Sequence, residues 1–312
     1  MNWFHQLPEF LVLGITRGSM YALIAIGYTL VYGVLQLINF AHSEVFMAGT
    51  FGSYLVVEQL VPHTGHASPA HVVVIVLIGI LAGAAVSSGV AWVVERIAYR
   101  TLRRRGAPKL AFLISAIGTS FFLSQLAGKL FNRFNNNPFP VYFKDRPLFH
   151  IGSAEVRVVQ LMVVAAAVVC MIALDRLVQG TKLGRSIRAV AEDAPTAALM
   201  GIDIDKTISR TFLLGGILAG VAAFLFGTAY GFSYQVGFNQ GNKAFAAAVL
   251  GGIGNIRGAM LGGMLLGIAE AVIPPLSFIG IAWTDVVAFV VLVVVLIVRP
   301  TGILGEKLGR AA

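Results

Sequence analysis

Long apolar runs recur along nearly the whole chain, and they constrain its fold more than any other feature. A membrane-spanning helix needs about 20 consecutive, mostly apolar residues. Eight stretches approach or exceed this length: residues 10–33, 45–61, 72–94, 110–131, 157–176, 209–231, 257–275 and 282–298. Of the 312 residues, 57% are hydrophobic and 12% are charged, whereas soluble domains carry about 25% charged residues. The sequence therefore predicts an all-α polytopic integral membrane protein, with a single transmembrane domain over residues 1–312.

A ninth segment, residues 241–255, is shorter and rich in glycine. Gly251, Gly252 and Gly254 lie close together in it and are followed by Asn255. Each glycine weakens a helix by about 1 kcal/mol relative to alanine. Non-helical backbone at membrane depth is tolerated only where protein or a water-filled cavity covers it. The segment is predicted to be either a broken crossing or a re-entrant piece that lines a pathway through the protein, so the total is eight or nine spans.

The distribution of basic residues predicts the orientation. Segment 96–109 carries six of them, Arg96, Arg100, Arg103, Arg104, Arg105 and Lys109. Short loops rich in Lys and Arg stay in the cytoplasm. Segment 177–208 follows two spans later and is then cytoplasmic too, as is the basic C-terminal tail, while the N-terminus lies outside. The net charge of +9 comes from such loops, so nucleic-acid binding is not expected.

Polar side chains interrupt the apolar sequence at two places. Asn39, His42 and Glu44 lie between the first two apolar runs, and Glu270 lies within a later one. Ionisable groups at membrane depth are costly and are functional candidates by default. We predict that these four residues line the pathway. Two alternatives stay open: the first group is an interfacial turn in which Ser43 or His42 caps the next helix, and Glu270 pairs with another helix.

The segment 177–208 contains a predicted short helix. Asp193 is a good N-cap, Pro195 is tolerated in the first turn, and Gly201 suits the position after the helix end. An exposed helix that ends in Leu199 and Met200 needs a partner to cover it. We therefore expect a docking element on the cytoplasmic side. Its candidate residues are Arg185, Arg188, Glu192, Asp193, Leu199, Met200 and Gly201.

Several motifs are missing from the sequence. It has no phosphate-binding loop of the G-x-x-x-x-G-K-[ST] type and no His-Glu-x-x-His or Ser-His-Asp constellation, so neither ATP binding nor catalysis is expected in this chain. His63, His66 and His71 lie close together, but exposed loop histidines explain them better than a metal site. No cofactor is expected.

Three stretches together resemble the branched-chain amino-acid ABC permeases of the LivH type. They are GSMYALIAIGYTLVYGVLQLINFAHSEVFMAGTF (residues 18–51), GRSIRAVAEDAPTAALMGIDIDKT (184–207) and AAVLGGIGNIRGAMLGGMLLGIAEA (247–271). The family often has glycine at the position of Ser43 and proline at that of Arg257. These two departures bear on the substrate rather than on the class of protein.

The resemblance implies a permease of the bacterial inner membrane that imports leucine, isoleucine or valine. It would pair with a second, related permease, with two cytoplasmic ABC ATPase subunits and with a periplasmic substrate-binding protein. Residues 185–201 would couple ATPase closure to the spans. Two alternatives remain: import of another small polar solute such as urea or an amide, and, in a different class, an ion-coupled secondary transporter.

Overall fold

The computed structural model describes residues 3–61, 68–131, 138–143, 145–276 and 280–305. His63 and His66, the basic residues Lys307 and Arg310 of the tail, and part of the loop after residue 131 lie outside these ranges. The helical part of the fold agrees with the predicted class. A short antiparallel hairpin was not expected; it consists of β1 (Pro147–Ile151) and β2 (Ala154–Arg157).

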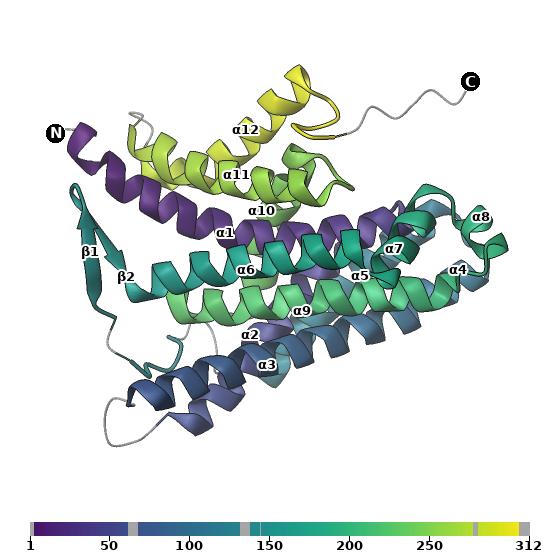
Figure 1. Ribbon diagram of the computed structural model, residues 1–312, viewed down its shortest axis with the longest axis horizontal. Coiled ribbons are helices and arrows are strands. Elements are labelled where there is room, and N and C mark those ends of the chain that lie inside the picture. Colours follow the sequence, from purple (N-terminus) through teal and green to yellow (C-terminus); the bar gives the residue numbers. More distant parts are fainter. Residues whose placement is uncertain (1–2, 62–67, 132–137, 144, 277–279, 306–312) are drawn as a thin grey trace.

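Helices lie roughly along one axis and form a bundle (Figure 1). The long helices and their neighbours are α1 (Trp3–Leu35), α2 (His42–Leu60), α3 (Pro69–Val94), α5 (Lys109–Leu130), α6 (Val158–Gly180), α9 (Ile204–Tyr230), α10 (Val236–Gly251), α11 (Ile256–Leu276) and α12 (Thr284–Val298). The short ones are α4 (Arg100–Arg104), α7 (Lys182–Glu192), α8 (Ala194–Leu199), the π-helix η1 (Glu95–Tyr99) and the 3-10 turn η2 (Ile281–Trp283).

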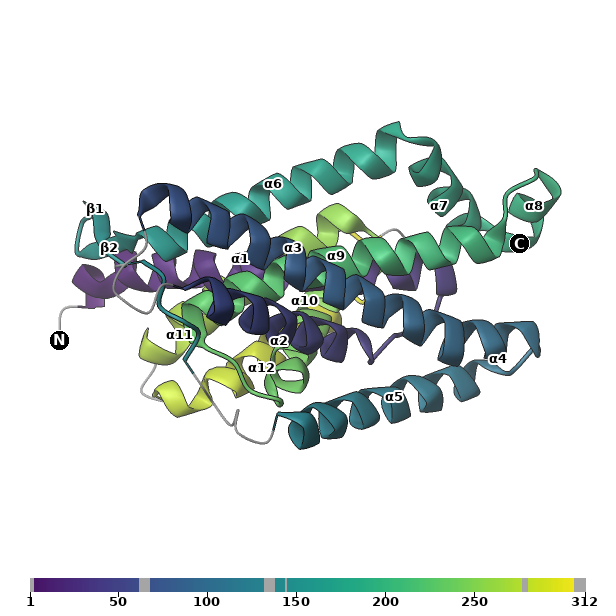
Figure 2. The ribbon, with the colours of Figure 1, turned by 90° about the horizontal axis from the view of Figure 1, so that it is seen from below.

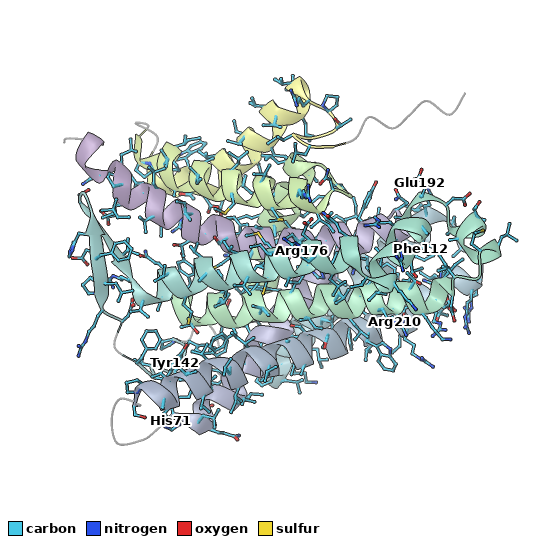
Figure 3. All side chains as sticks on the ribbon, viewed as in Figure 1. His71, Phe112, Tyr142, Arg176, Glu192 and Arg210 are labelled. Atoms are coloured by element: carbon cyan, nitrogen blue, oxygen red, sulfur yellow. The ribbon has the colours of Figure 1, made fainter. Side chains whose placement is uncertain are left out.

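The two ends of the bundle differ in content. The N-terminus and the β-hairpin lie at one end, here the hairpin end, and α4, α7 and α8 lie at the other, here the α8 end (Figures 1 and 2). The side-chain view places His71 and Tyr142 at the hairpin end and Glu192 toward the α8 end (Figure 3). Segments 96–109 and 177–208, which the sequence assigns to the cytoplasm, therefore both reach the α8 end.

Six helices in the described part of the chain are long and apolar enough to cross a membrane: Gln6–Leu35, Pro69–Arg104, Lys109–Leu130, Val158–Gly180, Ile204–Tyr230 and Ile256–Pro275. The apolar helix Thr284–Val298 is shorter. The chain is thus a multi-pass membrane protein. The predicted stretches 45–61 and 241–255 are not among the six, because α2 is polar near its start and α10 has only 16 residues, so the count of eight or nine is not confirmed.

Small residues bring the central helices together. α1 packs along α11, and α3 packs along α9. A side chain on Gly18 would meet the backbone of Met264, and one on Gly216 would meet the backbone of Ser88 at 2.6 Å. Small residues four apart on one helix face allow such close backbone approach in lipid. These glycines therefore let the paired helices pack backbone against backbone.

The two segments that the sequence assigns to the cytoplasm, 96–109 and 177–208, are more helical than the sequence suggested. Residues 96–104 continue α3 through the π-helix η1 into α4, so only residues 105–108 connect this helix to α5. In the same way, α6 extends to Gly180 and α7 begins two residues later. The segments are therefore rigid extensions of membrane helices rather than flexible loops.

Candidate functional site

The connection between α1 and α2 folds back into the bundle. Asn39 is 2% exposed and Ala41 is fully buried. The Asn39 side-chain oxygen accepts hydrogen bonds from the hydroxyl of Tyr99 at 2.7 Å and from the Ala41 backbone N–H at 3.1 Å. Buried backbone without a helical partner must be satisfied in this way. Asn39 therefore fixes the re-entering chain against η1.

Glu44 lies in the first turn of α2 and is 1% exposed. Its Oε1 accepts hydrogen bonds from the Ser43 hydroxyl at 3.4 Å and from the Ser120 hydroxyl at 3.2 Å. Ser120 lies near the middle of α5, which is one of the six candidate spans. Glu44 is therefore at membrane depth, where an ionisable group is costly and marks a functional site.

The start of α10 packs against the start of α2. A side chain on Gly237 would lie 2.6 Å from Oε2 of Glu44, and one on Gly241 would collide with Ser43. Four residues further along α10, the Phe245 ring is 5.6 Å from that of Phe40. Along α10, the first residues lie beside Glu44 and later ones lie beside Phe40, which precedes α2 in the chain. The two helices therefore both start near Glu44 and run away from it in opposite directions. The positive ends of both helices are close to this carboxylate, which is the favourable place for an anion.

A polar groove opens between α5, α10 and the first turn of α2. Its volume is about 390 Å³, within the range of roughly 300–1,000 Å³ typical of small-molecule sites. The groove is lined by Phe40, Ser43, Glu44, Ile117, Ser120, Phe121, Ser124, Gln125, Tyr234, Gln235, Phe238, Asn239 and Asn242. Among these residues Glu44 carries the one charge. Polar amides and hydroxyls thus meet aromatic and aliphatic surface at membrane depth.

His42 points away from this groove. It is buried, and its ring packs edge to face against Tyr28 of α1 with centroids 4.9 Å apart. Gly27 leaves the space that the imidazole occupies. The alternative in which Ser43 or His42 caps the helix is wrong, because the N-cap of α2 is Ala41 and both residues lie within the helix. The structure therefore brings Glu44 to the groove and places Asn39 and His42 behind it.

Glu270 lies apart from the groove, in an ion pair between helices. Its Oε1 is 2.6 Å from the Lys243 ammonium, which also lies 2.7 Å from a carboxylate oxygen of Asp285. Glu270 is 3% exposed. Paired charges of this kind join α10, α11 and α12. The alternative in which Glu270 pairs with another helix agrees with this geometry.

The glycine run forms the turn between α10 and α11. Gly252 and Gly254 have φ values of +107° and +96°, which favour glycine. The C-terminal segment closes this turn, since the Ile303 and Leu304 N–H groups donate to carbonyls of α10 at 2.9 and 3.0 Å. The Asn255 side chain donates to the Leu304 carbonyl. The predicted pathway residues Gly251, Gly252, Gly254 and Asn255 therefore lie away from the groove, and their pathway role stays a prediction.

The short helix predicted within segment 177–208 is confirmed as α8. Asp193 is its N-cap and accepts a hydrogen bond from the Thr196 N–H, and Gly201 has a φ of +83° just after its end. The hydrogen bonds from Thr196 lower the pKa of the Asp193 carboxyl below its usual value. Leu199 is 88% exposed and Met200 is 79% exposed. The apolar tip of α8 is therefore uncovered in this chain.

The other candidate residues of this segment lie on α7. Arg188 donates to the Val178 carbonyl at 2.8 Å and so ties α7 to the end of α6. Arg185 and Glu192 are exposed. Their part in coupling stays a prediction.

An ionic cluster connects the basic segment with the start of α9. Asp205 pairs with three arginines of α4, namely Arg100, Arg103 and Arg104. Arg103 also contacts the fully buried Glu95, whose other oxygen accepts a hydrogen bond from Ser209 at 2.6 Å. Because α8 leads directly into α9, this cluster connects the segment that contains α8 to η1, the π-helix that carries Tyr99.

Sequence reasoning missed the residues that α5 and α10 contribute to the groove. Ser120 and Ser124 are four apart, and Asn239 and Asn242 are three apart. Polar residues at this spacing share one face of a helix. These polar pairs, each on one face of a mostly apolar helix, could have indicated the groove. Tyr99 had no such signal, because its partner Asn39 is distant in sequence.

Comparisons with known proteins assign the family. A family model described as the permease component of branched-chain amino acid transport systems matches residues 10–296. The chain belongs to this family. The high-affinity branched-chain amino acid permease LivH of Escherichia coli strain K12 is 40% identical, with 94% of each chain covered. The permease BraD of Pseudomonas aeruginosa is 42% identical, with 97% of each covered.

A further relative is similar over only part of its length. LsrC of Klebsiella pneumoniae, named as an autoinducer 2 import permease, is 34% identical over 43% of this chain and 40% of its own.

Proposed function

We propose that this chain is the membrane-spanning subunit of an ABC importer that moves leucine, isoleucine and valine across the bacterial inner membrane. The observation that carries the proposal is the uncovered apolar tip of α8, in a chain that belongs to a permease family and has no ATP-binding motif of its own. Large exposed apolar side chains at a helix end require a partner. In this proposal the partner is one of two cytoplasmic ATPase subunits.

The ionic cluster gives the proposal a mechanical basis. Closure of the ATPase subunits would move α8, and α8 continues into α9 within five residues. Asp205 of α9 holds the arginines of α4, and Tyr99, the residue directly before α4, donates a hydrogen bond to Asn39. A rigid-body movement at α8 would thus reach the re-entering connection beside the groove.

The groove supports pairing with a second, related permease. Its polar lining includes a buried carboxylate at membrane depth, and exposure of such a surface to lipid is unfavourable. A second permease packed over α5 and α10 would enclose the groove and make it a pathway. A periplasmic binding protein would deliver the solute at the hairpin end.

The same proposal orders the helices across the membrane. With the N-terminus outside, α1, α3, α6 and α12 run inward and α5, α9 and α11 run outward. The short helices α2 and α10 provide the two remaining crossings. This gives nine crossings and a cytoplasmic C-terminus.

The experiment is a pull-down of the tagged chain in mild detergent from its native cells. We expect the ATPase subunits to co-purify and leucine-loaded binding protein to stimulate ATP hydrolysis. Purification of the chain alone would contradict the proposal.

The carried solute is the part of the proposal that the family fixes least. The relative named for autoinducer 2 import matches only part of this chain, whereas LivH and BraD match nearly all of it. This favours branched-chain amino acids over urea, an amide or another polar solute. Glu270, one candidate for an ion-coupled relay, is paired with Lys243, which favours the ATP-driven class.

A further inference from the structure

The groove contains a buried carboxylate that has no counter-ion among the described residues. Glu44 is 1% exposed, and among the described residues its Oε2 has no hydrogen-bond partner. The two groups that donate to its Oε1 are neutral hydroxyls, and none of the described residues that line the groove carries a positive charge. A buried carboxylate that lacks a cation is unfavourable. The nearby starts of α2 and α10 supply only partial positive charge, so a cation would complete the site.

Lys243 does not supply this cation, although it lies on α10, one of the helices that line the groove. Its ammonium is held by Glu270 and Asp285. The arginines of α4 are held by Asp205 and Glu95 at the α8 end. The cation must therefore come from outside the described part of the chain.

The rest of the groove matches the other parts of an aliphatic amino acid. Ile117, Phe121 and Phe238 provide apolar surface beside Glu44. The amides of Gln125, Asn239 and Asn242 can donate hydrogen bonds to a carboxylate. A carboxylate for an ammonium group, amides for a carboxylate and apolar side chains for a branched chain thus line one cavity.

We propose that Glu44 binds the α-ammonium group of the transported amino acid, in a membrane-depth binding site formed by α2, α5 and α10. This proposal rests on the proposed function and assigns the substrate contact within it. The alternative occupants of the carboxylate are a proton and a metal cation such as sodium.

The first test uses the wild-type complex of this chain with its partner permease and ATPase subunits. Binding of radiolabelled leucine is measured without binding protein, and 3-methylbutan-1-amine and 4-methylpentanoate are compared as competitors. The amine has the ammonium group and the acid has the carboxylate, on similar branched chains. We expect the amine to displace leucine at least tenfold better than the acid. Equal displacement, or no leucine binding up to tens of millimolar, would overturn the ammonium site.

A metal cation is tested in the same assay by replacing sodium with N-methylglucamine. We expect unchanged leucine binding, and a strict requirement for sodium would overturn the proposal.

The second test locates the site. Glu44→Gln keeps the shape of the side chain and removes its charge, and Glu58→Gln is the matched control, an exposed glutamate on the same helix. We expect at least a tenfold weaker binding of leucine and slower uptake in Glu44→Gln, with ATP hydrolysis by the complex retained, and no change in Glu58→Gln. Unchanged binding in Glu44→Gln would overturn the proposal. If this variant does not assemble, the competition in the wild-type complex still decides.

The failure of this site is distinct from the failure of the proposed function. ATP-dependent leucine uptake by the wild-type complex tests the importer itself. If the complex takes up leucine but the amine does not compete better than the acid, only the role of Glu44 is wrong and the importer function stands.

Discussion

The helices α9 and α5 have similar apolar character but different surroundings. Their most apolar stretches have mean hydropathies of 2.1 and 1.7, yet 67% of that stretch is buried in α9 and 17% in α5. Glycines let α9 pack against α3. In α5, large apolar side chains such as Phe121 and Phe122 are more than half exposed. Hydropathy thus identifies both as membrane helices, while side-chain size decides which one forms the core and which one faces lipid or a partner.

The sharpest test of this comparison places the same side chain on both helices. A side chain on Gly220 of α9 would collide with the backbone of Gly83, whereas Gly118 of α5 has open space around it. Overpacking typically costs about 1–3 kcal/mol and occasionally more, and a leucine forced against backbone that cannot move aside belongs to the costly cases. We expect Gly220→Leu to abolish folding and Gly118→Leu to leave the isolated chain unchanged, measured by detergent-resistant monodispersity and thermal unfolding. Equal behaviour of the two variants would contradict the account.

The second prediction concerns the ends of the two helices. Leu199 of α8, next to α9, and Leu110 in the first turn of α5 are both exposed. If α8 docks on the ATPase subunit, Leu199→Glu places a charge in an apolar contact and abolishes ATP-dependent uptake, while membrane insertion is normal. Leu110→Glu serves as the control and retains most uptake. Normal uptake by Leu199→Glu would remove the coupling role of α8.

The third prediction concerns Tyr99, where the two helices meet. Its ring lies 5.4 Å from that of Phe212 in α9 and 6.2 Å from that of Phe112 in α5. Tyr99→Phe removes the hydrogen bond to Asn39 and should cost about 1 kcal/mol of stability. Tyr142→Phe is the matched control, since this buried tyrosine is hydrogen-bonded to Thr228 at the hairpin end.

Uptake separates the structural and functional effects of these two variants. At a similar loss of thermal stability, we expect slower uptake in Tyr99→Phe than in Tyr142→Phe. Equal uptake would mean that the contact between Tyr99 and Asn39 has only a structural role.

The smallest expected effect is at the start of α9. Asp205→Asn removes the ion pairs to α4, which are partly exposed and so are worth about 1 kcal/mol or less. Because salt screens such pairs, thermal stability of the wild type should fall slightly in 1 M NaCl, and that of Asp205→Asn should not. Asp175→Asn, which breaks the pair with Arg257, is the control for a general loss of charge. A salt response equal to that of the wild type would show that Asp205 contributes nothing measurable.

The sequence predicted the parts of the fold that depend on local patterns. Apolar runs located the six candidate spans, and the Asp193 cap with Gly201 located α8. The continuation of α3 through η1 was missed, because clustered arginines are typical of a loop. Their carboxylate partner, Asp205, neutralises them in the helix but is about 100 residues away in the sequence. Contacts between distant residues are not encoded in local periodicity.

The site was predicted in part for the same reason. Glu44 stood out as a charge beside an apolar run, and the structure places it at the groove. The glycines around Gly252 predict a segment that lines the pathway, because non-helical backbone in the membrane must be covered by protein or a water-filled cavity. The structure has them in a turn covered by the C-terminal segment, and no local pattern indicates that residues 303 and 304 return to this point.

The most direct test of the central claim is leucine uptake by proteoliposomes that contain the chain with its partner permease, ATPase subunits and binding protein. The account predicts that uptake requires ATP on the side of the membrane where the α8 end lies. Collapse of the proton and sodium gradients should leave this uptake unchanged. Uptake by the chain alone, driven by an ion gradient without ATP, would contradict it.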